Sequence, residues 1–452
     1  MTKMDILLGG IPRSGTTALA RAVELHPDIF CWSWETALLP FLDELTRGLS
    51  MRPENPANVE RMISRHLKSA IIDQREWHWE KNGIVPPVEI TIDEINQLAR
   101  NVSEIFQRGL RRTHTLQECT GLLRNFLGQY SDRRLIAEKS PSNVLLVGEC
   151  FNLAQRWLIT HREPFAVIAS MLERTKADPW ANIMGGEIER RIGLYIRHAR
   201  GVISAKENSN EAMVLTFDDL MTDPCGCLAN VCLFLQVEPT LRYLHQVRSI
   251  IGGKPTTDKW NGFTPLDRWK ILRLCSFEVQ ALGYTEHYYR TSFTEMSRGL
   301  PTSLESQLQP LYGSFEPTEL LPMRWVQRSS SFAIYAPRGV NTLTLKIHNN
   351  ISAVLEVLRV QGDSTEDWHV TAYSDAGAAS PLRLSRFSLT ENVFGDWQID
   401  LRGAEPIGHH GNWCLFKIDL ETNFAFTPCF TFAESSDVRT MSFGLVDWRL
   451  DR

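Results

Sequence analysis

The strongest constraint on the fold is a short stretch near the start of the chain, Ile6-Leu7-Leu8-Gly9-Gly10-Ile11-Pro12-Arg13-Ser14-Gly15-Thr16-Thr17. An apolar run leads into a turn rich in Gly and Pro, and residues 18–26 continue as a segment typical of a helix. This order predicts a strand, a loop and a helix. In such a unit, backbone N–H groups and the helix N-terminus surround a phosphate group.

The loop differs from the usual ATP- or GTP-binding loop, G-x-x-x-x-G-K-[ST], although Gly10 and Gly15 have the same spacing. Thr17 occupies the Ser/Thr position. Thr16, however, occupies the Lys position, and the nearest cation is Arg13 inside the loop. The stretch therefore predicts a 5′-phosphate site that lacks the usual apparatus for a γ-phosphate.

The segment from Pro12 to Thr17 resembles the 5′-phosphosulfate loop of sulfotransferases that use 3′-phosphoadenosine 5′-phosphosulfate (PAPS). An ordinary strand, turn and helix, whose glycines only serve the turn, is the structural alternative. The resemblance implies that the sulfate donor contacts the loop residues Gly10, Pro12, Arg13, Ser14, Gly15, Thr16 and Thr17.

The bulk properties indicate a globular protein with more than one domain. A chain of 452 residues favours two domains, and its net charge of −5 gives no reason to expect a nucleic-acid partner. Nine scattered cysteines without a C-x-x-C pair favour reduced thiols over a disulfide framework or a zinc cluster. The loop begins too early to leave room for a signal peptide, and no apolar run is long enough to span a bilayer. We therefore expect a cytoplasmic protein.

Three further strands are predicted at residues 134–138, 156–160 and 213–217, each short, apolar and separated from the next by helical sequence. This alternation is typical of a parallel α/β sheet covered on both faces. Ligands of such sheets lie beyond the carboxyl ends of the strands. The residues expected there are Arg13, Lys139, Ser140, Pro141, His161, Arg162, Glu163, Pro164, Asp218 and Asp219.

The pattern changes to period two from residue 325 onward, most clearly at residues 342–347. Similar runs lie at residues 355–357, 397–401, 415–420 and 443–448. Residues 325–452 are therefore predicted to form an antiparallel β-sandwich domain. The α/β domain is assigned to residues 1–290 and a connecting segment to 291–324. We expect the two domains to fold separately, provided that no surface of the sandwich completes the core of the α/β domain.

Two more motifs extend the resemblance, Glu138-Lys-Ser-Pro141 and Thr160-His-Arg-Glu-Pro164. In sulfotransferases, an Arg at the end of a strand and a Ser on the next helix hold the 3′-phosphate of the donor. Arg162 and Ser170 match that spacing. A guanidinium fork together with a hydroxyl donor suits a phosphate dianion, which is the physical reason for the pair.

The pattern over residues 5–285 is most similar to tyrosylprotein sulfotransferases and their bacterial relatives. It includes a Glu-Thr pair at Glu35, although the spacing from the preceding His-Pro is one residue longer than in that family. It also includes Lys254, Lys259 and Trp260, which the resemblance places over the nucleotide. A structural turn is an equal alternative for these three residues.

The resemblance implies sulfonyl transfer to a hydroxyl group. Glu35 is the candidate general base that takes the proton of the attacking hydroxyl. Arg13 and Lys139 are candidates to stabilise the charge that develops on the leaving oxygen. PAPS departs as a stable bisphosphate, so no metal ion is expected.

The acceptor is expected to be a small molecule or a glycan: first a carbohydrate or glycolipid, by analogy with other sandwich-containing enzymes, and second a tyrosyl or other phenolic group. Two alternative functions stay open at this point. One is a P-loop kinase or NTPase, and the other is a non-catalytic nucleotide-binding or glycan-binding protein. The sequence does not predict the oligomeric state.

Overall fold

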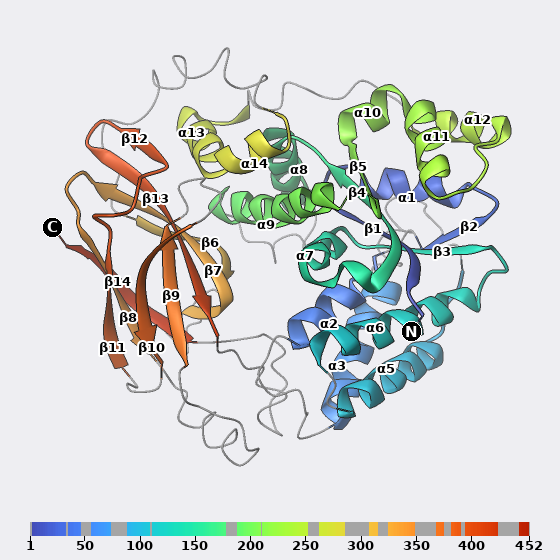
Figure 1. Cartoon of the computed structure of the whole chain (residues 1–452), viewed down its shortest axis with the longest axis horizontal. Helices are drawn as coiled ribbons and strands as arrows, with labels where there is room; N and C mark the ends of the chain where they lie inside the picture. The colour runs from blue at the N-terminus through green and yellow to red at the C-terminus, as the bar shows by residue number, and fades with distance from the viewer. Residues whose placement is uncertain are drawn as a thin grey trace.

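The computed structural model shows an α/β region and a β-sandwich region side by side (Figure 1). The residues that it describes are 2–32, 35–46, 56–73, 88–108, 111–177, 188–208, 210–251, 262–284, 307–314, 324–348, 368–374, 381–389, 394–423 and 443–451. The helices and strands up to residue 284 make up the α/β region, and the strands from residue 307 make up the β-sandwich region.

The α/β region contains a five-stranded sheet in which all paired strands are parallel. Its strands are β1 (Met4–Gly10), β2 (Ile29–Trp32), β3 (Leu135–Lys139), β4 (Ala154–His161) and β5 (Ala212–Thr216). Their order across the sheet is β2-β3-β1-β4-β5. The phosphate-loop strand β1 is therefore central, and the predicted parallel α/β fold is confirmed.

The sequence predicted four of these strands and missed β2, at the edge of the sheet next to β3. Ile29–Trp32 is only four residues long and runs into a segment with further Trp and Ser residues. No turn signal therefore marks its end in the sequence. Pairing with β3, from Ile29 opposite Leu135 to Trp32 opposite Glu138, defines it as a strand.

Helices cover both faces of this sheet. One face packs against α1 (Thr16–Glu24), α10 (Phe217–Thr222), α11 (Pro224–Phe234) and α12 (Leu241–Ile250). The other packs against α2 (Leu38–Thr46), α3 (Pro56–Lys68), α5 (Ile92–Gln107), α6 (Arg112–Gly128), α7 (Val147–Cys150), α8 (Pro164–Ala177), α9 (Ile188–Glu207), α13 (Pro265–Leu274) and α14 (Ser276–Ala281). Three shorter turns, η1 (Ser69–Asp73), η2 (Pro141–Leu146) and η3 (Phe151–Leu153), complete this layer.

Alternate side chains of the strands supply the two cores. Leu7 of β1 packs into the cluster with α2, α3 and α9, whereas Ile6 and Leu8 pack into the cluster with α1 and α11. Because successive side chains of a strand point to opposite faces, a continuous apolar strand is what a sheet covered on both sides requires.

The β-sandwich region is a nine-stranded antiparallel sheet. Its strands are β6 (Gln307–Ser314), β7 (Arg324–Pro337), β8 (Thr342–His348), β9 (His369–Ser374), β10 (Leu382–Ser388), β11 (Phe394–Asp400), β12 (Gly408–His410), β13 (Trp413–Thr422) and β14 (Phe443–Asp451). The order is β10-β9-β13-β7-β14-β8-β11, with β6 also on β7 and β12 also on β13.

The two ends of this sheet meet, so that it encloses its own apolar core. Ser385 Oγ of β10 donates a hydrogen bond to Gln398 O of β11 at 3.2 Å, and Trp397 Nε1 donates to Ser385 Oγ at 3.0 Å. The enclosed side chains include Phe332 and Ile418. The predicted β-sandwich is confirmed in class, whereas the strand predicted at residues 355–357 lies outside the described residues.

The two regions share part of one apolar core. Leu311 of β6 and Tyr335 of β7 belong to the same buried cluster as Ile192 of α9 and Trp269 of α13. At Gly193 an added Cβ atom would lie 2.1 Å from Leu311 O, so α9 and β6 are in direct backbone contact. The condition for separate folding is therefore not met. Residues 307–314, assigned from the sequence to the connecting segment, form a strand of the sandwich.

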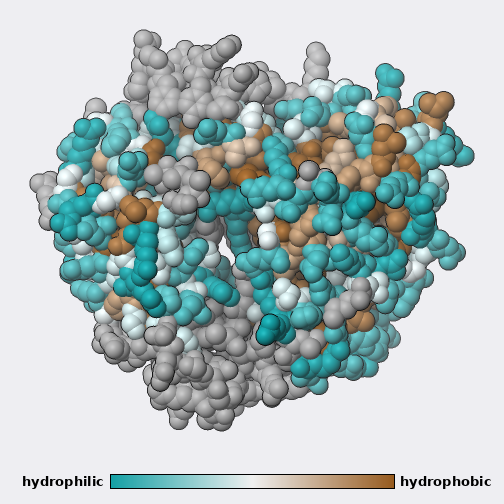
Figure 2. Space-filling model, in the orientation of Figure 1, coloured by the Kyte–Doolittle hydropathy of each residue, from teal (hydrophilic) through white to brown (hydrophobic). Residues whose placement is uncertain are grey.

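Polar side chains also join the regions. Lys270 Nζ and Tyr335 Oη both donate to Glu189 Oε1, at 2.6 and 3.3 Å. Arg200 lies 3.2 Å from Glu278 and 3.7 Å from Asp419. The space-filling view shows a hollow between the two regions (Figure 2). A cavity of about 350 Å³ also lies between them, lined by residues of α2, α7, α9 and β7.

In the part of the chain that the structure describes, no helix combines the length and the apolar composition needed to cross a membrane.

Candidate active site

The loop after β1 is fastened to the end of β4. Ile11 N donates to Thr160 O at 3.0 Å, and Ser14 Oγ hydrogen-bonds Ile11 O and Thr160 Oγ1 at 2.5 and 2.7 Å. Gly10 has φ +149°, and a Cβ atom there would lie 2.3 Å from Thr160 O. Only glycine fits this approach. Ser14 is fully buried, so its hydroxyl holds the loop in shape.

The N-terminus of α1 follows directly. Gly15 is its N-cap residue, with φ +88°, and it makes no side-chain cap hydrogen bond. The first-turn N–H groups of a helix have no partner within the helix, so this end favours an anion. Thr17 is exposed there, Pro12 is half-buried and Thr16 is buried. The strand, loop and helix predicted from the sequence are confirmed.

Arg162 follows β4 and is buried beside this loop. Its guanidinium carbon lies 4.0 Å from the centre of the Phe217 ring, a cation–π contact. The same ring underlies Gly15, because an added Cβ atom would lie 2.7 Å from it. Burial lowers the pKa of Arg162. Phe217 was not predicted from the sequence as a site residue, although its place directly after β5 was a usable signal.

Arg13 joins the loop to α8. Its Nε donates to Ser170 Oγ at 3.1 Å, although the residues are 157 positions apart. Burial of the guanidinium lowers the pKa of Arg13, nearby Arg174 and Arg162 lower it further, and Glu35 opposes them. Cations held this close together are typical of a site for an anion.

Arg174 was not predicted. It lies four residues after Ser170 on α8, and therefore on the same helix face. That spacing is the signal that finds it. The predicted Arg13, Arg162 and Ser170 thus lie together, with Arg174 as a further cation.

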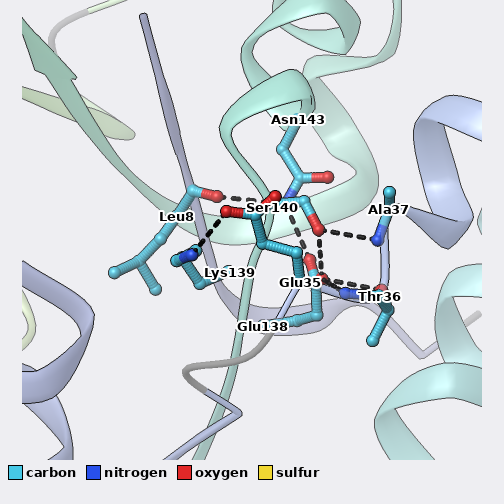
Figure 3. Close-up of polar contacts among 8 residues, drawn as sticks. All are labelled: Leu8, Glu35, Thr36, Ala37, Glu138, Lys139, Ser140 and Asn143. Atoms are coloured by element: carbon cyan, nitrogen blue, oxygen red, sulfur yellow. Dashed lines mark hydrogen bonds and ion pairs between the residues drawn. The ribbon is translucent and has the colours of Figure 1, made fainter. Parts of the chain in front are cut away.

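Glu35 and Lys139 form an ion pair next to the loop (Figure 3). Lys139 Nζ lies 2.8 Å from Glu35 Oε1. The Lys139 side chain is 3% exposed, whereas the Glu35 side chain is 41% exposed. The carboxylate is therefore accessible to another molecule, while the ammonium group is enclosed by protein.

A buried carboxylate lies behind this pair. Glu138 is fully buried and accepts hydrogen bonds from Thr36 Oγ1 at 2.7 Å, Ser140 Oγ at 2.6 Å and Asn143 Nδ2 at 2.7 Å (Figure 3). Burial raises the pKa of Glu138, and these hydrogen bonds oppose the rise. Glu138 belongs to a motif of the sequence, Glu138-Lys-Ser-Pro141, but no role was predicted for it. A charged residue inside an apolar strand was the available signal.

A second polar pair lies at the end of β4. Tyr284 Oη lies 2.8 Å from His161 Nδ1. Burial lowers the pKa of His161 to about 4. The predicted nucleotide contacts Lys254, Lys259 and Trp260 lie outside the described residues.

A family model described as "Sulfotransferase family" matches residues 5–240, just over half of the chain. The chain belongs to the sulfotransferase family. The protein is an enzyme of this class, and the resemblance found in the sequence is confirmed. The matched segment of the sulfotransferase contains Arg13, Glu35, Lys139, Arg162 and Ser170, and it ends before the β-sandwich region.

Solved structures that are similar to this sulfotransferase are remote in sequence. The sulfotransferase domain of the Synechococcus olefin synthase is 18% identical, with 64% of this chain and 95% of that chain covered and a TM-score of 0.34. STF9 from Mycobacterium avium is 11% identical, with 64% and 78% covered and a TM-score of 0.37. Mouse SULT7A1, complexed with PAP, is 13% identical, with 64% and 90% covered and a TM-score of 0.34. Curated protein sequences give no match.

Proposed function

We propose that this sulfotransferase transfers the sulfonate group of PAPS to a hydroxyl group of an acceptor molecule. The observation that carries the proposal is the hydrogen bond from Arg13 to Ser170. It joins the loop expected to bind the 5′-phosphosulfate to the helix that, with Arg162, is expected to bind the 3′-phosphate. Two anionic groups of one nucleotide would then lie against one cluster of cations.

The chain's own residues suit the chemistry of the transfer. The acceptor oxygen attacks sulfur, a new O–S bond forms, and the S–O bond to the 5′-phosphate breaks, with its electron pair going to the phosphate oxygen. Glu35 takes the acceptor proton, because its carboxylate is accessible. Arg13 and Lys139 stabilise the negative charge on the leaving oxygen.

We assign this chemistry to residues 1–290, and the β-sandwich, expected from residue 325 to residue 452, already begins with β6 at residue 307. A carbohydrate or glycolipid is our first choice of acceptor, on the analogy of fold between the sandwich and those of glycan enzymes. A tyrosyl or other phenolic group is the second. The scattered cysteines support the cytoplasm as the compartment.

Nucleotide specificity tests the donor site. At a concentration one hundred times its Kd, 3′-phosphoadenosine 5′-phosphate (PAP) is expected to stabilise the protein by about 2.7 kcal/mol. ATP, ADP and adenosine 5′-phosphate at the same concentration are expected to stabilise it much less, because they lack the 3′-phosphate. The measurement is the thermal unfolding midpoint with each nucleotide. Equal shifts with PAP and adenosine 5′-phosphate would contradict the roles of Arg162 and Ser170.

Labelled PAPS tests the reaction itself. Incubation with separate pools of oligosaccharides, glycolipids and tyrosyl peptides is expected to label one pool. Heat-inactivated protein is the control for chemical sulfation. Stabilisation by PAP without transfer to any pool would contradict the proposed acceptor classes and leave the donor site intact.

A further inference from the structure

A second interaction joins the same two segments beside the ion pair of the candidate active site. In the ion pair β3 supplies the donor, and in the second interaction β3 supplies the acceptor. Two neighbouring residues of one segment, Glu35 and Thr36, face two neighbouring residues of β3, Glu138 and Lys139 (Figure 3). Lys139 donates to Glu35, and Thr36 donates to Glu138 through its hydroxyl at 2.7 Å and its N–H at 3.4 Å. The contact between Thr36 and Glu138 therefore lies directly beside the contact between Glu35 and Lys139.

The segment is fastened at its next residue too. Ala37 N donates to Ser140 Oγ at 2.8 Å, and Ser140 Oγ donates in turn to Glu138. Ala37 has φ +46°, a left-handed conformation that non-glycine residues rarely adopt. The hydrogen bonds around Glu138 hold this unfavourable conformation, which lies two residues after Glu35 and directly before α2.

The same group of residues is tied to the phosphate-loop strand. Asn143 Nδ2 donates both to Glu138 Oε2 at 2.7 Å and to Leu8 O at 3.0 Å. Ser140 N also donates to Leu8 O at 3.2 Å. Leu8 lies two residues before Gly10 in β1. One buried carboxylate is therefore connected to the segment of Glu35, to Lys139 and to the strand that enters the phosphate loop.

A fully buried carboxylate is costly unless its oxygens are hydrogen-bonded. Both oxygens of Glu138 accept hydrogen bonds, and the donors come from the segments after β2 and after β3. An apolar side chain would pack in the same place without that cost. What an apolar side chain cannot do is fix the direction of the two segments.

We propose that Glu138 is a positioning residue of the sulfotransferase. With Thr36, Ser140 and Asn143, here named the Glu138 cluster, it sets the geometry of Glu35 and Lys139 without itself touching the substrate. The inference rests on the proposed function, because Glu35 and Lys139 are assigned to the transfer there. Positioning of this kind has large effects, since a displacement of about 1 Å costs on the order of 100-fold in rate.

Thr36 provides the sharpest test, because two substitutions separate hydrogen bonding from packing. Thr36→Ser keeps the hydroxyl and loses the methyl group, whereas Thr36→Val keeps the shape and loses the hydroxyl. Glu138→Gln is the companion variant. Thr120→Val is the matched control, because Thr120 Oγ1 of α6 is also buried and donates to Leu116 O at 2.6 Å outside the cluster.

The expected result is a selective loss of turnover. Thr36→Val and Glu138→Gln are expected to lower kcat by about 10- to 100-fold, while PAP affinity changes less than about twofold. Thr36→Ser and Thr120→Val are expected to keep kcat near that of the wild type. Equal kcat in Thr36→Val and the wild type would overturn the proposal. So would equal losses in Thr36→Ser and Thr36→Val, which would indicate packing.

A second measurement does not depend on activity. Reductive methylation followed by mass spectrometry reports how accessible Lys139 is. The Lys139 amine is expected to react slowly in the wild type and Thr36→Ser, and several-fold faster in Thr36→Val and Glu138→Gln. Unchanged labelling in the last two would overturn the positioning role. Absence of sulfonate transfer by the wild type, with these labelling differences present, would instead contradict the proposed function alone.

Discussion

Among single residues, Glu35 and Lys139 of the ion pair differ in the solvent exposure of their side chains. Glu35 is 41% exposed and Lys139 is 3% exposed at the side chain. These exposures suit the two proposed roles, because an enclosed side chain stays in place beside the leaving oxygen and an accessible carboxylate can meet the acceptor hydroxyl. The two roles are separable by mutation.

Glu35→Gln is expected to lower turnover by about 10²- to 10⁴-fold and to leave PAP affinity unchanged, because the amide keeps the size of the side chain but takes no proton. The measurement is kcat together with PAP affinity. Glu60→Gln is the control, since Glu60 forms an exposed ion pair with Arg100 on the surface. Near-normal turnover of Glu35→Gln would show that the base is another residue, without affecting the family assignment.

Arg13→Ala is the contrasting variant in the same assays. Because Arg13 belongs to the phosphate loop and bonds Ser170, it is expected to lose both PAP affinity and turnover. Lys139→Ala is expected to lose more turnover than affinity. If Arg13→Ala kept wild-type affinity for PAP, the loop assignment would be wrong.

At the level of the element, the end of β4 serves three purposes in three consecutive residues. Thr160 binds the phosphate loop, His161 lies against Tyr284, and Arg162 lies over Phe217. Successive side chains leave a strand in opposite directions, so one strand end contacts both layers of the molecule. His161 is the titratable member of this group.

The His161 imidazole makes stability depend on pH. Its pKa is lowered from 6.5 to about 4, so the unfolded chain binds the extra proton first as the pH falls. Protonation therefore costs the folded state about 3 kcal/mol, a destabilisation that is absent above pH 6.5 and develops progressively toward pH 4. His161→Gln is expected to flatten the fall of the thermal midpoint between these pH values. Parallel midpoint curves for the variant and the wild type would contradict this.

For the whole molecule, the junction of the two regions contributes to the stability of the α/β region. The period-two pattern of the sequence predicted only a separate sandwich domain. The apolar core of the α/β region includes Leu311, Ala333, Tyr335 and Leu415 from the sandwich. Asp419 also lies beside Arg200 of α9. The sandwich therefore closes one side of the sulfotransferase fold.

Truncation after residue 300 tests this closure. Removal of the four buried side chains that the sandwich contributes to this core is expected to lower the free energy of unfolding by on the order of 5 kcal/mol. It also exposes the apolar face of α9. We expect the truncated protein to aggregate or to unfold at a much lower temperature, measured by size-exclusion chromatography and thermal unfolding. A monomeric truncated protein with wild-type PAP affinity would show instead that residues 1–300 fold alone.

The sequence by itself determined the elements whose causes are local. The Gly-rich stretch around Gly10 and Gly15, the apolar runs of β3, β4 and β5, and the alternation in β8 and β13 each carry their own backbone preferences. It also indicated which residues end the strands. Parallel strands place their carboxyl ends at one edge, so Arg13, Lys139 and Arg162 were expected together from order alone.

Only the tertiary structure decided the pairings. Arg13 meets Ser170, and Lys139 meets Glu35, across 157 and 104 positions of sequence, and no periodicity encodes such contacts. The role of Glu138 depends on donors from two separate segments, and the strand character of β2 depends on its neighbour β3. The physical reason is that the role of a buried polar group and the pairing of an edge strand depend on neighbouring segments. These segments come together only in the folded chain, and the local sequence does not specify them.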